Sequence, residues 1–261
     1  MINLLINIKN FIIFLYVYVR FFILLKLKDY FSDNKDESRV KWANMIGKYN
    51  FNLLSYIFKN RIKLNEKVKE MHKITILNSN HFSNFDNLIL FVLLNDNKID
   101  PFKISSISTF KNISEFDKKI LNLIEAINSD NIMNEIDDKI DNFYQKDYNY
   151  FLISFFEGIA LNHSKNRPFY KYLNRPKYLA FELLCNKLNG NKFYDLDLVY
   201  TYNSKIMNSK DQFFLIKLFH PKCKIYINVK ICEFPKKNER EYLDNLYLTK
   251  SENIKSILNS I

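Results

Sequence analysis

A histidine and an aspartate five residues apart stand where an apolar strand gives way to a helix. The segment 80–86 reads NHFSNFD. Across a strand-to-helix turn, this spacing can return the Asp86 carboxylate to the His81 ring and fix the tautomer of the imidazole. The second ring nitrogen is then free to take a proton from a substrate hydroxyl. The alternative is that Asp86 only caps the helix and that His81 only packs.

A second carboxylate follows the apolar run YFLISFF at positions 150–156, and it is followed directly by a glycine. The chain has only three glycines, and one of them is Gly158, next to Glu157. In α/β proteins the end of a buried strand is where sites usually lie. An ordinary turn is the alternative. Because no protein nucleophile accompanies His81 and Asp86 in their segment, that pair favours direct transfer onto a bound alcohol.

The two segments together, N-H-x-x-x-x-D and then F-x-E-G some seventy residues further on, resemble the glycerolipid acyltransferase (PlsC-like) family. The resemblance spans roughly Ile74 to Pro235. It includes two downstream segments, YLNRPKYLAFELLCNKL (172–188) and KFYDLDLVYTY (192–202). These look like the segments that follow the Glu-Gly motif in the eukaryotic 1-acylglycerol-3-phosphate and lysocardiolipin acyltransferase branch.

The resemblance implies transfer of an acyl group from acyl-CoA to a lysophospholipid hydroxyl, first of all from 1-acyl-sn-glycerol-3-phosphate to phosphatidate. It makes His81 the general base and Asp86 its orienting partner, and it places Asn80, Glu157 and Gly158 at the substrate. It implies acyl-CoA as donor, no metal, and a location in the endoplasmic reticulum membrane. Lysophosphatidylinositol or lysocardiolipin as acceptor, or a non-catalytic lipid-binding relative, are the alternatives.

The sequence departs from the family pattern where the acceptor phosphate is bound. The usual F-P-E-G-T-R is FFEGIA at positions 155–160, and the middle block with its arginine is not recognisable between Phe102 and Asn131. A basic stretch downstream could replace the missing arginines, because arginine can hold a phosphate with two hydrogen bonds. We expect Lys165, Arg167 and Arg175 to bind substrate; a solvated basic loop is the alternative.

The N-terminus carries an apolar segment, FIIFLYVYVRFFILL at positions 11–25, interrupted only by Arg20. With the apolar residues before it, the segment is long enough for a bilayer core of about 30 Å. The segment KLKDYFSDNKDES follows it and contains no small-residue cleavage site. We therefore predict a membrane anchor over residues 1–32, as a signal anchor or a helix embedded in one leaflet, and an acyltransferase domain over 33–261. A buried helix is the alternative.

Composition and charge limit the partners and cofactors that the protein can have. The net charge of +11 suits nucleic acid, anionic lipid or a phosphorylated substrate, but no nucleic-acid-binding module is recognisable. The three cysteines form no C-x-x-C pair, and the four histidines have no zinc-binding spacing. Three glycines cannot build a dinucleotide-binding or Walker loop. We therefore expect reduced thiols, no metal and no nucleic-acid partner.

The elements that position these residues alternate between strand and helix. This order predicts an α/β fold with one central, mostly parallel or mixed sheet flanked by helices, in addition to the N-terminal membrane helix. We expect strands near 73–77, 102–108, 150–156, 194–202 and 224–232. Helices are expected near 42–59, 86–94, after a Ser114 cap, 131–144 and 175–190, and the tail from Ser251 is expected to be a short helix at most.

Overall fold

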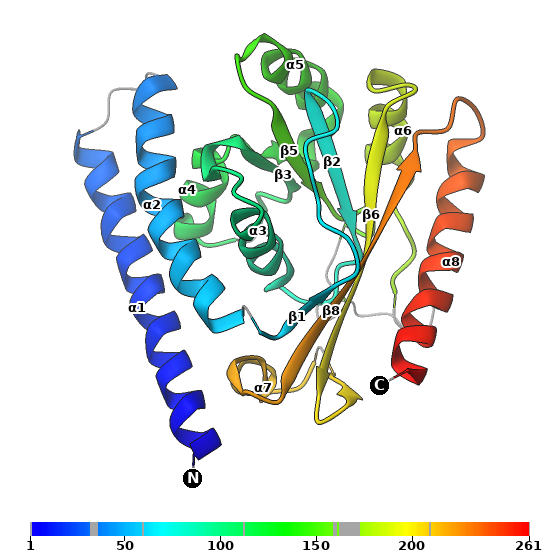
Figure 1. Ribbon diagram of the computed structural model, residues 1–261. Coiled ribbons are helices and arrows are strands. Elements are labelled where there is room, and N and C mark those ends of the chain that lie inside the picture. The colour runs from blue at the N-terminus through cyan, green and yellow to red at the C-terminus, as the bar shows by residue number, and fades with distance from the viewer. Residues whose placement is uncertain are drawn as a thin grey trace.

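The computed structural model describes residues 2–31, 36–58, 60–111, 113–158, 161, 173–208 and 210–260. Its centre is one mixed sheet in the order β1-β8-β6-β2-β5-β3-β4, with β7 paired to β6 (Figure 1). The strands are β1 Ile62–Leu64, β2 Ile74–Ser79, β3 Ile104–Ser108, β4 Ile127–Asn128, β5 Tyr150–Ser154, β6 Lys192–Tyr202, β7 Lys205–Ile206 and β8 Cys223–Glu233.

The strands from β6 to β4 in this order run parallel, whereas β8 pairs with β6 in the antiparallel direction. The predicted single mixed sheet is therefore confirmed. β2 and β5 lie side by side, with Asn78 opposite Ser154. This register brings the segments that follow both strands to the same edge of the sheet.

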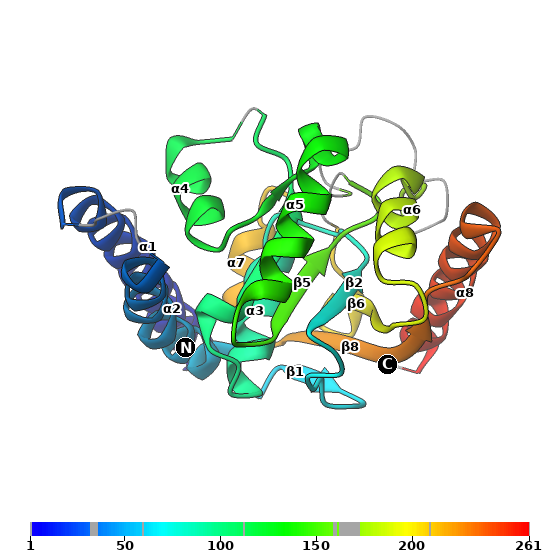
Figure 2. The ribbon, with the colours of Figure 1, turned by 90° about the horizontal axis from the view of Figure 1, so that it is seen from above.

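Helices cover both faces of the sheet and form two hydrophobic cores. One core lies beneath α2 and α3, with α1 outside α2, and the other lies beneath α5, α6 and α8. Seen from above, α1 and α2 stand on one flank and α8 on the opposite one (Figure 2). The helices are α1 Ile2–Phe31, α2 Asp36–Phe58, α3 Asp86–Asp96, α4 Glu115–Leu123, α5 Ile132–Gln145, α6 Tyr178–Lys187, α7 Phe214–Phe219 and α8 Glu239–Asn259, with short 3-10 turns η1 Pro101–Lys103 and η2 Ser129–Asn131.

Local sequence signals located several of these elements correctly. The Ser114 side chain accepts a hydrogen bond from the Asp117 N–H and caps α4 as predicted. The alternation expected in β8 holds from Cys223 to Val229, whose odd-numbered side chains are buried. It fails at Ile231, which is about half exposed near the end of the strand. Pro101 and its neighbours form η1, so β3 starts at Ile104 and not at Phe102.

The prediction for the C-terminus was wrong. Instead of a short helix from Ser251, α8 runs for 21 residues from Glu239 and covers one face of the sheet. Its buried side chains follow helical spacing, and one of them is a lysine: Leu243, Tyr247, Lys250 and Ile254. Because a lysine stands in the apolar stripe, the stripe is hard to recognise in the sequence.

The N-terminal segment forms α1, the one described helix that is long and apolar enough to cross a membrane. One side of α1 packs on the protein through Val17 and Leu25, which are buried. The opposite side exposes large apolar side chains from Ile2 to Ile23. Arg20 does not face outward: its guanidinium donates to Asn50 Oδ1 at 2.7 Å and lies over the Tyr49 ring of α2.

Candidate active site

The candidate site lies at the carboxyl ends of the neighbouring parallel strands β2 and β5. His81 follows β2 by two residues and Glu157 follows β5 by three. The Glu157 carboxylate accepts a hydrogen bond from the His81 backbone N–H at 3.0 Å. The backbone N–H of Leu161 in turn donates to the His81 carbonyl at 2.7 Å. The two motifs are therefore joined in space by direct hydrogen bonds.

The contact that the His-Asp spacing predicts is present. His81 Nδ1 lies 3.1 Å from Asp86 Oδ2. Asp86 is the first residue of α3, and its carboxylate accepts hydrogen bonds from the backbone N–H groups of Phe82 and Ser83, at 2.6 and 2.9 Å. Both donors precede the helix, so Asp86 closes the turn before α3 rather than capping the helix.

The other oxygen of Asp86 is held by hydroxyl groups. Oδ1 accepts from Ser83 Oγ at 3.1 Å and from Tyr200 Oη of β6 at 2.7 Å. Burial, reinforced by the adjacent Asp86 carboxylate, raises the pKa of Tyr200 well above its ordinary value, so the phenol keeps its proton and donates. The carboxylate is fully buried, and these donors replace the water that it has lost.

The His81 ring is fixed on one side and accessible on another. It stacks on the Phe155 ring, with centroids 4.2 Å apart, and 17% of the side chain is exposed. Nδ1 faces Asp86, and the described residues provide no hydrogen-bond partner for Nε2. An imidazole held in this way by a carboxylate has one nitrogen available to accept a proton from a bound hydroxyl.

Glu157 is buried and braces the turn of the site. Its second oxygen accepts from the Asn174 backbone N–H at 2.8 Å, so that the carboxyl group links the His81 turn to the segment before α6. Burial raises the pKa of Glu157 to about 8, although both N–H donors act in the opposite direction. These contacts give Glu157 a positioning role, and direct substrate contact by Glu157 stays a prediction.

Two features at position 158 favour glycine: the backbone conformation and the close approach of the Lys177 side chain. Its φ is +69°, a left-handed conformation that favours glycine. A Cβ at this position would also lie 2.8 Å from the Lys177 side chain. Gly158 therefore allows the Lys177 stem to cross directly over the Glu-Gly motif.

The other predicted substrate-binding residues have different environments. Asn80 is buried, and its amide group donates to the Leu198 carbonyl at 2.9 Å and accepts from the Leu198 N–H at 2.6 Å, which anchors the turn to β6. Arg175 is exposed and donates to the Tyr178 hydroxyl at 3.0 Å. Lys165 and Arg167 lie outside the described residues. Substrate binding by these residues stays a prediction.

A buried charge cluster behind the site was not predicted. Lys250 of α8 is fully buried, and its ammonium lies 2.9 Å from Asp195 Oδ1 and 3.5 Å from Asp197 Oδ1. It also donates to the Leu196 carbonyl at 2.7 Å. Asn78 of β2 donates to Asp195 at 2.6 Å, and this contact links the cluster to the strand that precedes His81. The alternating aspartates in DLDLV (195–199) are the sequence signal that could have revealed it.

Within the described part of the chain, no three His, Cys, Asp or Glu side chains lie close enough to hold a metal ion. The three cysteines are free thiols. Burial raises the pKa of Cys185 and Cys223 to about 12, so neither is a ready nucleophile. That catalysis needs no metal stays a prediction.

Comparison with known proteins shows a likeness in fold to a solved structure. No family model matches the chain, and no curated protein matches it. Among solved structures it is similar to the 1-acyl-sn-glycerophosphate (LPA) acyltransferase PlsC from Thermotoga maritima, with a TM-score of 0.50 and 14% identity, over 97% of each chain. At this identity the likeness establishes a shared fold over nearly the whole length, including the N-terminal apolar helix.

Proposed function

We propose that the protein is a membrane-associated glycerolipid acyltransferase that transfers an acyl group from acyl-CoA to the hydroxyl of a lysophospholipid. The observation that carries the proposal is the His81 Nδ1–Asp86 Oδ2 contact of 3.1 Å at the carboxyl ends of two parallel strands. The fold shared with PlsC supports the same reaction class. The first acceptor we propose is 1-acyl-sn-glycerol-3-phosphate, which would give phosphatidate.

In this reaction His81 Nε2 takes the proton from the acceptor hydroxyl while its oxygen attacks the thioester carbonyl. The buried Asp86 carboxylate stabilises the imidazolium that forms. The tetrahedral intermediate then collapses by breaking the carbon–sulfur bond, and the imidazolium returns the proton to the departing CoA thiolate. The new ester leaves as product, so that no covalent acyl-enzyme intermediate is needed.

We further propose that α1 is embedded in one leaflet and does not cross the bilayer. Asn10 of α1 donates to the Phe219 carbonyl at 3.0 Å, and Asp29, near the other end, pairs with Lys119 of α4. α1 therefore contacts the body of the protein from Asn10 to Asp29. A crossing orientation would draw α2 and α4, with exposed charges such as Lys48, into the hydrocarbon, at a high cost in free energy.

The endoplasmic reticulum and the eukaryotic branch of the family stay predictions, since a shared fold does not discriminate between membranes or branches. The acceptor headgroup is likewise open, because the family arginines that bind phosphate are replaced. Lysophosphatidylinositol and lysocardiolipin are therefore the alternative acceptors. A lipid-binding protein without activity is the remaining alternative, and the intact His81–Asp86 pair argues against it.

The test is transfer of a labelled acyl group from one acyl-CoA to a panel of acceptors by the purified full chain in mixed micelles. We expect phosphatidate to form from lysophosphatidate and the matched His81→Ala variant to be inactive. Product from lysophosphatidylinositol or lysocardiolipin alone would change the acceptor but keep the reaction. Tight lipid binding with no product from any acceptor would overturn the proposed activity.

A further inference from the structure

The short helix α7 and the turn before it present two large apolar side chains to solvent. Phe213 is 51% exposed and Ile216 is 52% exposed. Being three residues apart on one helical turn, they lie on one face. Phe214, Leu218 and Phe219 are buried beneath them and fix the helix to the core. The turn is also ordered, because the Phe213 N–H donates to Asp211 Oδ1 at 2.8 Å.

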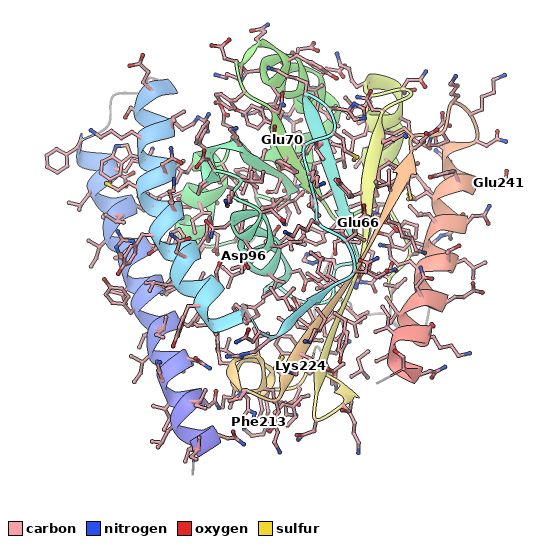
Figure 3. All side chains as sticks on the ribbon, viewed as in Figure 1. Glu66, Glu70, Asp96, Phe213, Lys224 and Glu241 are labelled. Atoms are coloured by element: carbon pink, nitrogen blue, oxygen red, sulfur yellow. The ribbon has the colours of Figure 1, made fainter. Side chains whose placement is uncertain are left out.

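The helix that carries this apolar pair packs against α1. The Phe219 ring of α7 packs against the Phe14 ring of α1, with centroids 4.7 Å apart, and against Phe11 at 6.4 Å. Phe213 lies at the same end of the molecule as the N-terminal part of α1 (Figure 3). Apolar surface of this kind on two adjoining elements is typical of a shared interaction face.

The segment that contains α7, residues 203–224, is basic. Residues 203–224 contain five lysines and one aspartate, giving +4 with His220 neutral. Lys217 pairs with that aspartate, Asp211. The other lysines are exposed or half-exposed: Lys205, Lys210, Lys222 and Lys224. An apolar pair within a lysine-rich segment matches an anionic bilayer surface, in which the apolar side chains enter the acyl region and the ammonium groups meet phosphates.

We propose that α7 and its preceding turn form a second bilayer contact beside α1, with Phe213 and Ile216 inserted and the lysines of residues 203–224 at anionic headgroups. The proposal rests on the membrane association proposed above. It also places the bilayer close to the candidate site. The Phe214 ring packs against Phe85 at 6.2 Å and Tyr200 at 5.7 Å, and both belong to the surroundings of Asp86. A bilayer held by α7 therefore lies one aromatic layer from the His81 turn.

The test places an environment-sensitive fluorophore at position 216 through Ile216→Cys, in the full chain with Cys232→Ser as background because Cys185 and Cys223 are buried. A probe at Leu15→Cys reports α1. A probe at Leu248→Cys, an equally exposed apolar position on α8, is the matched control. Vesicles contain phosphatidylcholine alone or with one quarter phosphatidylglycerol, with and without brominated chains.

With anionic vesicles we expect a blue shift and bromine quenching at positions 216 and 15 and neither effect at 248. Raising the salt concentration should reduce the effect at 216. A response at 15 but not at 216 would overturn the α7 contact while leaving membrane association intact. No response at either position would remove the membrane association itself. A concentration-dependent shift at 216 without lipid would indicate a second copy of the chain and would also overturn the proposal.

Discussion

Two buried charge clusters lie on opposite faces of the same sheet, and they satisfy their charges in different ways. Asp86, on the α3 face, is held by two backbone N–H groups, two hydroxyls and the His81 imidazole. Asp195 and Asp197, on the α8 face, share a single cation, the Lys250 ammonium. Both arrangements keep carboxylates out of water, but only in the first is a partly exposed partner, His81, able to take up a proton.

The difference shows what separates a candidate site from a structural brace. A sealed ion pair holds elements together and has no group left for a substrate. An imidazole that is held by a buried carboxylate and is partly exposed can accept a proton from a substrate and release it again during a reaction. Both clusters bury charge, so burial of charge does not distinguish them. The distinguishing property is a partly exposed partner that can bind and release a proton.

The largest expected effect comes from Asp86→Asn. The asparagine amide cannot accept from all of the donors around Asp86, and it cannot stabilise an imidazolium, so we expect kcat/KM to fall by about 10²- to 10⁴-fold. Steady-state acyl transfer at several pH values measures this. If the loss were tenfold or smaller, the carboxylate would not be acting on His81, and the two clusters would both be structural.

Lys250→Met should affect stability far more than chemistry. The substitution leaves the Asp195 and Asp197 carboxylates buried without their cation, which costs about 3–5 kcal/mol of unfolding free energy. Chemical denaturation measures this, and Lys255→Met on the exposed side of the same helix is the matched control. A decrease in unfolding free energy of less than about 1 kcal/mol in the Lys250 variant would mean that the cluster does not stabilise the fold.

Tyr200→Phe tests the donors around Asp86 one at a time. The phenylalanine ring keeps the shape and removes only the hydroxyl that donates to Oδ1, so we expect a stability loss of about 1.5–3 kcal/mol. Activity should fall much less than in the Asp86 variant, because the contact with His81 remains. Tyr202→Phe on the same strand is the control, and an equal loss there would show that the effect is not specific to Asp86.

The smallest and most specific expected effect is that of Glu157 on the pH dependence of the unfolding free energy. Its pKa is raised from 4.5 to about 8, so between these values the folded protein holds more protons than the unfolded chain. The Glu157 contribution to unfolding free energy therefore decreases as pH rises through this window. In Glu157→Gln this part of the slope should disappear. Identical slopes for both proteins would contradict the raised pKa.

The sequence was sufficient where the interaction is local. His81 and Asp86 are five residues apart on a strand-turn-helix, so spacing alone predicts their contact, and the Ser114 cap is equally local. It was insufficient where partners are distant. Tyr200 lies 114 residues from Asp86, and nothing in its surroundings marks it as a donor. Lys250 resembles a surface lysine until β6 and α8 are packed together, which is also why α8 was underestimated.

The most direct test of the central claim is the acyl-transfer rate of His81→Ala compared with His72→Ala. His72 is a second half-buried histidine, whose Nε2 accepts from the Lys192 N–H at 3.0 Å, away from Asp86. We predict that His81→Ala loses at least about 10²-fold in kcat/KM with a wild-type melting temperature, and that His72→Ala keeps its activity. Transfer by His81→Ala within twofold of wild type would contradict the account.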